Sequence, residues 1–397
     1  MKTQSNHFHR GFTLIELMLS TAVLALLMLL FVSMVEQTGK IWTRTSSKVS
    51  QFQATRVAFD AMTRNLSQAT LNTYWQPDPP RPIATAATAN SIANWSPSDY
   101  VRASDLHFVT GRSTQSDLLG TAETTNPTHT VFFQAPLGTT GEPDPNNNKL
   151  LKYDRLDNML AVIGYYVEWG ADTTRPPFLD AASSGIPPRY RFRLMQARQE
   201  GEDLALFGMN SKNAETPTNP PYKPTDWVKA ALGKKVGNWV PPASGTGTRL
   251  LEPRVMAENI VALVLMPKTS NATTGAAVTN RDLSPDYKYD SRPAKTTGVR
   301  YTWNDLKSNS LATERQWFNQ LPPVVQVTMV AIDEQSAQRI ASGTTAPNWT
   351  VGLFTKADKL EDDLNTLEAT LQAAHINYRI FSTDVVIRGS KWTRPEK

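Results

Sequence analysis

One acidic side chain interrupts an otherwise apolar segment near the N-terminus. The run FTLIELMLSTAVLALLMLLFVSMV, from Phe12 to Val35, has Glu16 as its only charged residue. As a helix it rises 1.5 Å per residue and spans about 36 Å, which is enough to cross a bilayer. A carboxylate inside hydrocarbon is costly unless a cation pairs with it, so Glu16 is predicted to be functional. The chemistry that this residue could perform is ion pairing, in which a cation neutralises the carboxylate.

The residues around Glu16 form a motif, Arg10-Gly11-Phe12-Thr13-Leu14-Ile15-Glu16, which follows a short polar leader. This motif resembles the leader and cleavage site of type IV prepilins and type II secretion pseudopilins. In that family a membrane-bound prepilin peptidase cuts after the glycine at the cytoplasmic face and methylates the new N-terminus. The resemblance implies that Gly11 ends the leader, that Phe12 becomes the methylated N-terminus, and that Glu16 forms the charge pair used in assembly.

The partner of Glu16 follows from the same cleavage. No lysine or arginine lies elsewhere in residues 12–35, so the amine that cleavage would create at Phe12 is the nearest positive charge. The two groups lie on one helical face and could pair within a chain, whereas the resemblance implies pairing with a neighbouring subunit. The alternative is a signal anchor in which Glu16 lies near the interface and reaches water.

The apolar segment is predicted to remain in the protein as a membrane anchor. No small-residue site of the A-x-A type closes it, and it is longer than the apolar region of a secretory signal peptide. Basic residues flank it on both sides, so the positive-inside rule does not orient it. The resemblance implies a single pass through the bacterial inner membrane, with the rest of the chain outside the cytoplasm, in the periplasm.

A helical pattern continues beyond this segment. Apolar residues such as Phe59, Met62 and Leu66 recur at helical spacing, which predicts a single helix that ends near Asn72 and packs its apolar stripe on a globular body. Prolines in the segment 75–82 are predicted to end it. The expected parts are a leader at 1–11, a transmembrane helix at 12–35, its amphipathic continuation at 36–74, and an extracytoplasmic β-rich domain at 75–397.

The remaining chain is predicted to form short strands joined by long loops. Its 27 prolines and 20 glycines argue against a helical array, and the strand-like runs lack a βαβ rhythm, which favours antiparallel sheet. A late helix at 355–374 places four leucines on one face, which favours packing on the sheet over a coiled coil. The fold class is therefore α+β, with a long N-terminal helix packed on a β-rich domain, as the pilin resemblance also implies. The predicted strands are 105–110, 130–134, 160–169, 189–195, 259–266, 324–332 and 378–387, and the long loops are 137–149, 208–248 and 267–298.

The body of the chain also resembles the J-type minor pseudopilin of type II secretion. Segments 52–69, 250–266 and 321–333 carry this likeness. An alternative match is the C member of the Verru-Chthon cassette, a bacterial group of four prepilin-like proteins. Both resemblances imply a minor, pilin-like subunit.

Composition and motifs argue against enzymatic chemistry. With 40% hydrophobic and 19% charged residues the chain is typical of a globular protein, and the lack of cysteine excludes disulfides, thiolate metal sites and thiol nucleophiles. There is no HExxH, G-x-S-x-G or Walker A motif, and His107, His129 and His375 are scattered. We predict no catalytic residue, no metal, no cofactor and no small-molecule substrate.

Three groups of side chains support alternative binding hypotheses. Arg189, Arg191 and Arg193 alternate along a predicted strand and could grip phosphate, or could form a solvated face paired with cross-strand carboxylates. One loop segment is interpreted as a turn rather than a calcium loop, and three similarly spaced loop acids are interpreted as a solvated run. Loop aromatics could form a recognition patch or pack beneath the loops. The turn segment is Asp144–Asn148, the loop acids are Asp282, Asp286 and Asp290, and the aromatics are Tyr222, Trp227, Trp239 and Trp303.

The leading hypothesis is a structural minor pseudopilin or pilin, processed by prepilin peptidase and assembled with other subunits into a type II secretion pseudopilus or a type IV pilus-like filament. The alternative is a pilin-anchored binding module, an adhesin or a nucleic-acid receptor. The formal charge is +5, and losing Lys2 and Arg10 with the leader would lower it by two, so nucleic acid is not supported as a partner. A membrane-anchored enzyme is the third hypothesis, and it would require a pocket with converging acids or histidines.

Overall fold

The structure is a computed structural model, and the chain in it divides into two units, Met1–Gln51 and Phe52–Lys397. For residues 43–51, and for those described between 143 and 151, only the backbone is described. Gly11 and Phe12 lie outside the described residues. The described residues are 13–78, 95–138, 143–144, 147–151, 158–172, 176, 178, 185, 188–201, 204–206, 225–234, 253–268, 283–292, 318–341 and 343–391.

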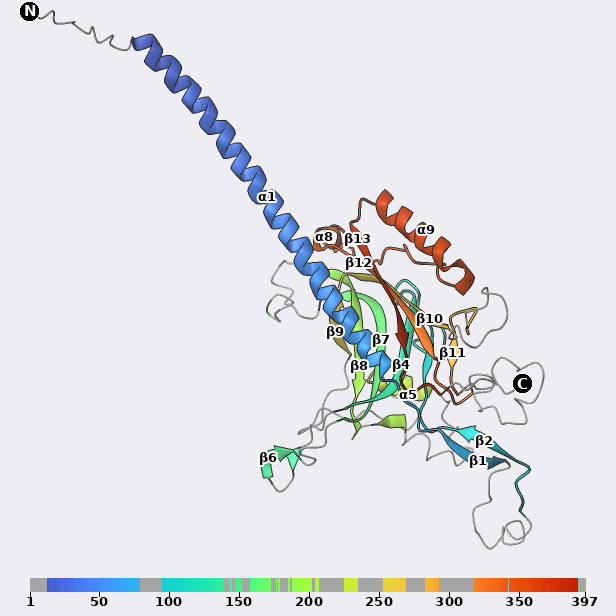
Figure 1. The fold of residues 1–397 in the computed structure, drawn as a ribbon. Helices are drawn as coiled ribbons and strands as arrows, with labels where there is room; N and C mark the ends of the chain where they lie inside the picture. Colours follow the sequence, from blue (N-terminus) through green and yellow to red (C-terminus); the bar gives the residue numbers. More distant parts are fainter. Residues whose placement is uncertain are drawn as a thin grey trace, which may run out of the picture. The chain divides into compact units, whose positions relative to one another are not determined.

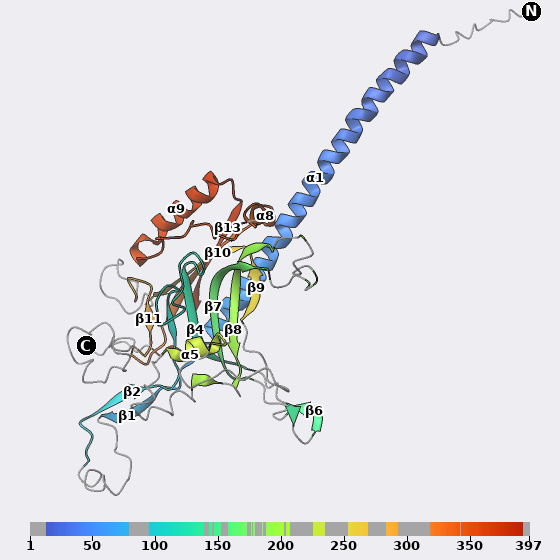
Figure 2. The same ribbon diagram turned by 180° about the vertical axis from the view of Figure 1, so that it is seen from behind.

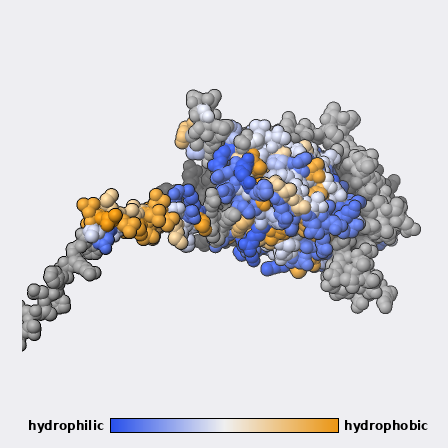
Figure 3. Space-filling view, turned by 90° about the horizontal axis from the view of Figure 1, so that it is seen from above, coloured by the Kyte–Doolittle hydropathy of each residue, from blue (hydrophilic) through white to orange (hydrophobic). Residues whose placement is uncertain are grey.

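The N-terminal helix α1 runs from Leu14 to Ser67 (Figure 1). Its part Leu14–Trp42 is long and apolar enough to cross a membrane, and its most apolar stretch is not buried in the protein. Figure 3 shows the apolar side chains of this segment in orange. The hydroxyl of Ser20 donates to the carbonyl of Glu16 at 2.6 Å. Such bonds to the helix backbone allow polar side chains to remain in hydrocarbon.

The helix ends earlier than the sequence predicts. It stops at Ser67 rather than near Asn72 or at the end of the predicted segment 36–74. Tertiary hydrogen bonds replace those of the helix at this point. The N–H of Arg388 donates to the carbonyl of Ser67 at 2.9 Å, and the N–H of Thr70 donates to the carbonyl of Gln134 in the sheet at 2.9 Å. Pro77, the first proline of segment 75–82, therefore lies beyond the helix end, in strand β1.

Two antiparallel sheets form the centre of the domain (Figure 1). The larger sheet has six strands in the order β11-β3-β4-β7-β8-β9, and the smaller has three in the order β10-β12-β13. Strands β1 and β2 form a separate pair, as do β5 and β6. Every pairing between described strands is antiparallel, as predicted. The bounds are β1 Tyr74–Asp78, β2 Asp99–Ala103, β3 Val109–Arg112, β4 His129–Gly138, β5 Pro143–Asp144, β6 Asn147–Leu151, β7 Met159–Ala171, β8 Tyr190–Gln199, β9 Arg254–Glu258, β10 Ile260–Lys268, β11 Tyr289–Asp290, β12 Val324–Ile332 and β13 Tyr378–Val386.

The predicted strand 105–110 is mostly wrong. Strand β3 begins only at Val109, because side chains satisfy the backbone that precedes it. The amide oxygen of Asn72 accepts from the N–H of Asp105 at 2.9 Å and from that of Leu106 at 3.0 Å. The side-chain oxygen of Gln134 accepts from the N–H of His107 at 2.7 Å. The other predicted strands overlap β4, β7, β8, β10, β12 and β13, whereas β1, β2, β5, β6, β9 and β11 were not predicted as strands.

Side chains of the large sheet alternate between two hydrophobic clusters. In β4, Val131 and Phe133 join a cluster shared with the small sheet and with Phe59, Met62 and Leu66 of α1. Phe132 lies between them in sequence and joins a second cluster on the opposite face. Both faces of the sheet are therefore covered, which explains why its central strands are apolar on both sides. The predicted apolar stripe of the helix is confirmed, since these three α1 residues are buried.

Short helices cover the two clusters. Helix α5, Asp226–Ala231, lies in a predicted long loop (Figure 2), and its Trp227 and Val228 belong to the second cluster. Helix α8, Glu334–Ile340, follows β12 directly. The late helix is confirmed as the 3-10 turn η5, Ala357–Lys359, followed by α9, Leu360–Ala373. Its leucines at 360, 367 and 371 are buried in the first cluster, so it packs on the domain as predicted.

A buried histidine links the two sheets at one edge of β10. The N–H of Leu265 donates to His129 Nδ1 at 3.1 Å, and the N–H of Leu263 donates to the hydroxyl of Thr128 at 2.9 Å. These side chains, at the start of β4, stand in for a neighbouring strand. His129 Nε2 donates to the carbonyl of Phe354 at 3.0 Å, so the ring is neutral with its proton on Nε2. Burial lowers the pKa of His129 to about 4.

Stability is expected to fall as the pH drops from 6.5 to 4. In that window the unfolded chain protonates His129 while the folded chain keeps it neutral, so protons favour the unfolded state, and the full contribution is present above pH 6.5. At about 1.4 kcal/mol per pKa unit, the loss is on the order of 3 kcal/mol. Urea unfolding of the full chain in detergent micelles, followed by tryptophan fluorescence, measures it across this window.

The matched variant is His129→Gln. Its side-chain amide keeps one acceptor and one donor but does not titrate. The variant is expected to show a smaller loss of stability over the same pH window than the unmodified protein. Equal losses in the two proteins would contradict the role assigned to His129.

Candidate functional site

Glu16 lies in the first turn of α1 and closes the start of that helix. Its Oε2 atom accepts from the backbone N–H of Thr13 at 3.0 Å and from the hydroxyl of Thr13 at 3.1 Å. The same hydroxyl oxygen accepts from the N–H of Glu16 at 3.3 Å. This reciprocal pattern is a capping box, in which a threonine and a glutamate three residues apart satisfy two N–H groups that the helix leaves without partners.

These contacts give the carboxylate of Glu16 hydrogen bonds, but they do not neutralise its charge. Both groups of Thr13 are neutral, and the Oε1 atom of Glu16 makes no hydrogen bond to any described residue. The side chain is exposed on the helix surface. Within residues 13–35 there is no lysine or arginine. A second acid near the end of the apolar segment differs in this respect, because Glu36 pairs with Lys40 one turn later at 2.5 Å.

The sequence analysis predicts Glu16 to be half of a charge pair, which stays a prediction, and it missed the part of Glu16 in the helix cap. The signal was available, since threonine followed three residues later by glutamate is the capping-box pattern. The other predicted site residues, Gly11 and Phe12, lie outside the described residues. Their roles in cleavage and methylation therefore stay predictions.

The arginines of β8 do not form a phosphate-binding face. Arg191 and Arg193 are 4% and 5% exposed, so the predicted solvated face is wrong at these two positions, whereas Arg189 is exposed. The two terminal nitrogens of Arg191 each lie 2.5 Å from a carboxylate oxygen of Glu334 in α8, and one lies 3.0 Å from Glu258 of β9. Arg193 lies 3.9 Å from its cross-strand neighbour Glu168. The guanidinium groups of both buried arginines are therefore paired with carboxylates of the same chain.

The ion cluster around Glu334 is structural. Burial raises the pKa of Glu334, but hydrogen bonds from Arg191 and Asn259 outweigh it and hold the pKa at about 2. Hydrogen bonding to Glu334 likewise raises the pKa of Arg191. The cluster joins β8, β9 and α8, three elements that the sequence alone gave no reason to bring together.

A second polar network lies beneath α5. Its centre is His107, whose Nδ1 accepts from the indole N–H of Trp227 at 2.9 Å and whose Nε2 lies 2.6 Å from Asp290. Because Nδ1 accepts, Nε2 carries the proton and donates to the carboxylate. Both ring nitrogens are occupied, so this His–Asp pair has no nitrogen free to activate a nucleophile. Trp227 is 1% exposed, which rules it out of a surface recognition patch.

The remaining residues that the sequence singled out form no metal site in the described part of the chain. No group of three or more histidine, aspartate or glutamate side chains there could hold an ion. Asp286 accepts from the N–H of Lys288 at 3.3 Å, whereas Asp290 is buried beside His107, so the predicted solvated run is wrong at Asp290. His375 is exposed at the end of α9. Asp282, the side chains of Asp144–Asn148, Tyr222, Trp239 and Trp303 lie outside the described residues.

The fold and the N-terminal segment define a class of protein. An apolar N-terminal helix with a capped glutamate precedes a domain built on antiparallel sheets, and this is an α+β, pilin-like fold. Residues 6–32 match the family described as the prokaryotic N-terminal methylation motif, which supports a type IV prepilin-like protein. The match includes Gly11, Phe12 and Glu16. No curated protein and no solved structure matches the chain.

Replacing Arg191 is expected to destabilise the domain. Arg191→Met leaves the carboxylates of Glu334 and Glu258 without their main partner in a partly buried place, and we expect a loss of about 2–3 kcal/mol in the free energy of unfolding. The control is Arg189→Met, because Arg189 is 47% exposed and reaches Glu334 by one contact of 3.2 Å. It should cost less than about 1 kcal/mol. Urea unfolding measures both, and equal costs would contradict the assignment.

Proposed function

We propose that the protein is a minor pseudopilin or pilin subunit, anchored in the bacterial inner membrane by α1 and assembled into a type II secretion pseudopilus or a type IV pilus-like filament. The observation that supports this most directly is Glu16, a carboxylate in the apolar span with only neutral partners among the described residues. The methylation motif at residues 6–32 supports the same proposal. Proteins with this motif are generally structural rather than enzymatic.

The proposed mechanism begins with cleavage. Prepilin peptidase would cut between Gly11 and Phe12 and methylate the new amine at Phe12. Thr13 is retained, so the capping box can still hold the carboxylate of Glu16 at the helix start through Oε2. The Oε1 atom would then receive the amine of a neighbouring subunit. Because both charges lie in a medium of low dielectric, their attraction is strong and each is costly without the other, which favours docking in one register.

The remaining features of the proposal are topological. We place the domain 75–397 in the periplasm and give the subunit three partners, namely prepilin peptidase, other pilin-like subunits and the inner membrane. A J-type role or that of the Verru-Chthon C protein suits a minor subunit that keeps Glu16, since the K-type subunit usually lacks this glutamate. We also propose that the subunit has no enzymatic activity, as is general for proteins with the methylation motif.

Blocking the proposed cleavage site tests the first step. Gly11→Leu is expected to prevent processing, because the peptidase of the family that the motif resembles cuts after a glycine. Mass spectrometry of protein from the native host should then find a species heavier by residues 1–11. The control is Gly39→Ala, since a Cβ at Gly39 meets no atom within 4 Å. Normal processing of Gly11→Leu would contradict the assigned site.

Three variants separate the charge of Glu16 from its capping role. Glu16→Gln keeps a capping box but removes the charge, whereas Glu16→Ala removes both. Both should insert into the membrane normally, and both should enter sheared filaments at a level reduced about tenfold or more relative to the unmodified subunit. Glu36→Gln is the control, because Glu36 already pairs with Lys40 in its own chain. Normal incorporation of Glu16→Gln would show that the charge is not needed.

A further inference from the structure

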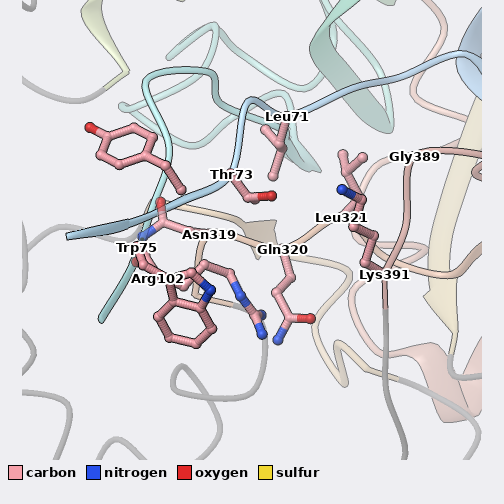
Figure 4. A pocket seen from close by; sticks show the side chains of 10 residues that line it. Leu71, Thr73, Trp75, Arg102, Asn319, Gln320, Leu321, Gly389 and Lys391 are labelled. Carbon is pink, nitrogen blue, oxygen red and sulfur yellow. Dashed lines mark hydrogen bonds between the residues drawn. The ribbon is translucent and has the colours of Figure 1, made fainter. Parts of the chain in front are cut away.

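A pocket of about 270 Å³ lies where the chain leaves α1 (Figure 4). Four segments that are distant in sequence line it, namely residues 71–75, Arg102 of β2, residues 319–321 before β12, and residues 389–391 after β13. None of them takes part in the membrane segment or in the ion cluster around Arg191. The volume is at the small end of ligand pockets and is suited to a single ring-sized group.

The walls of this pocket are fixed by the fold. The side-chain amide of Asn319 donates to the carbonyl of Arg102 at 2.7 Å, and the hydroxyl of Ser390 donates to the carbonyl of Leu321 at 3.1 Å. At Gly389 an added Cβ would lie 2.7 Å from the carbonyl oxygen of Ala69, so the chain can approach the end of α1 only with glycine there. These contacts hold the segments together without any ligand.

Two positive charges face the pocket without a counter-ion in the described part of the chain. The guanidinium of Arg102 and the ammonium of Lys391 make no hydrogen bond or ion pair with a described residue. Arg102 is partly buried, and burial lowers its pKa. A cation that is partly removed from water and has no partner favours an anionic ligand.

An aromatic platform lies beside these cations. In the β1–β2 pair, Trp75 is opposite Arg102 and Pro77 is opposite Tyr100, so the four side chains share one face. Trp75 is 68% exposed and Tyr100 is 59% exposed. Figure 4 shows the indole ring of Trp75 next to the guanidinium group of Arg102. Large exposed aromatic side chains that cluster in this way are typical of binding surfaces.

The geometry points to a uronic acid residue of an acidic polysaccharide as the ligand. The C–H bonds on one face of a sugar ring pack on the electron-rich face of an indole such as Trp75. Its carboxylate would lie between Arg102 and Lys391, and its hydroxyl groups match the amide of Gln320 and the hydroxyl of Thr73. Nucleic acid would need a longer row of cations than this pair. The inference goes beyond filament assembly and does not depend on it.

Calorimetric titration of the full chain in detergent micelles with tetragalacturonate tests the inference. We expect binding that falls about tenfold or more in Arg102→Gln and in Trp75→Ala, because each removes one of the two main recognition elements. Arg254→Gln is the control, since Arg254 is an exposed arginine on β9. Circular dichroism establishes that each variant remains folded.

Two further probes identify the chemistry that is recognised. If Arg102 and Lys391 bind the carboxylate of the sugar, the uncharged galactose tetramer should bind at least about tenfold more weakly than tetragalacturonate. Tetraglutamate should also bind more weakly, because it has no sugar ring for Trp75. Failure of tetragalacturonate to bind, equal binding of either comparison probe, or an equal loss in Arg254→Gln would overturn the inference.

Discussion

The structure of the N-terminal segment is governed by one constraint, which is that an ionised carboxylate cannot stay unpaired in hydrocarbon. Glu16 meets part of this requirement through the N–H and hydroxyl of Thr13, which also begin the helix. These partners are neutral, so they orient the carboxylate without cancelling its charge. In the proposed assembly the second part is supplied by another subunit. The same glutamate then serves the fold within a chain and the contact between chains.

The domain shows how side chains can substitute for strands. Both faces of the large sheet are covered, so its central strands bury apolar side chains on both faces and its buried arginines must find carboxylates in β9, α8 and β7. Where no strand among the described residues pairs with β10, Thr128 and His129 accept its N–H groups. Before β3, Asn72 does the same for Asp105 and Leu106. Polar side chains thus join pieces of a domain rich in loops.

The sequence could predict the features that depend on local pattern. The apolar helix, the antiparallel strands with long β-branched runs and the leucine face of α9 all follow from residue spacing, and each is present. It could not predict features that depend on distant partners. The helix ends at Ser67, where the backbone N–H of Arg388 donates to the Ser67 carbonyl. Arg191 can be buried because Glu334, at the start of the helix that follows β12, pairs with its guanidinium group. Trp75 was interpreted only as part of a helix stop, although its cross-strand neighbour Arg102 makes it part of a pocket.

The most direct test of the central claim is a distance measurement in filaments from the native host. Subunits labelled with ¹³C at the Glu16 carboxylate are mixed with subunits labelled with ¹⁵N at the amine of Phe12, and solid-state NMR measures the dipolar coupling between the two. The account predicts a contact within about 4 Å between different subunits, the distance of an ion pair. If filaments of normal length gave no coupling between the two labels, the pairing of Glu16 with a neighbouring N-terminus would be contradicted.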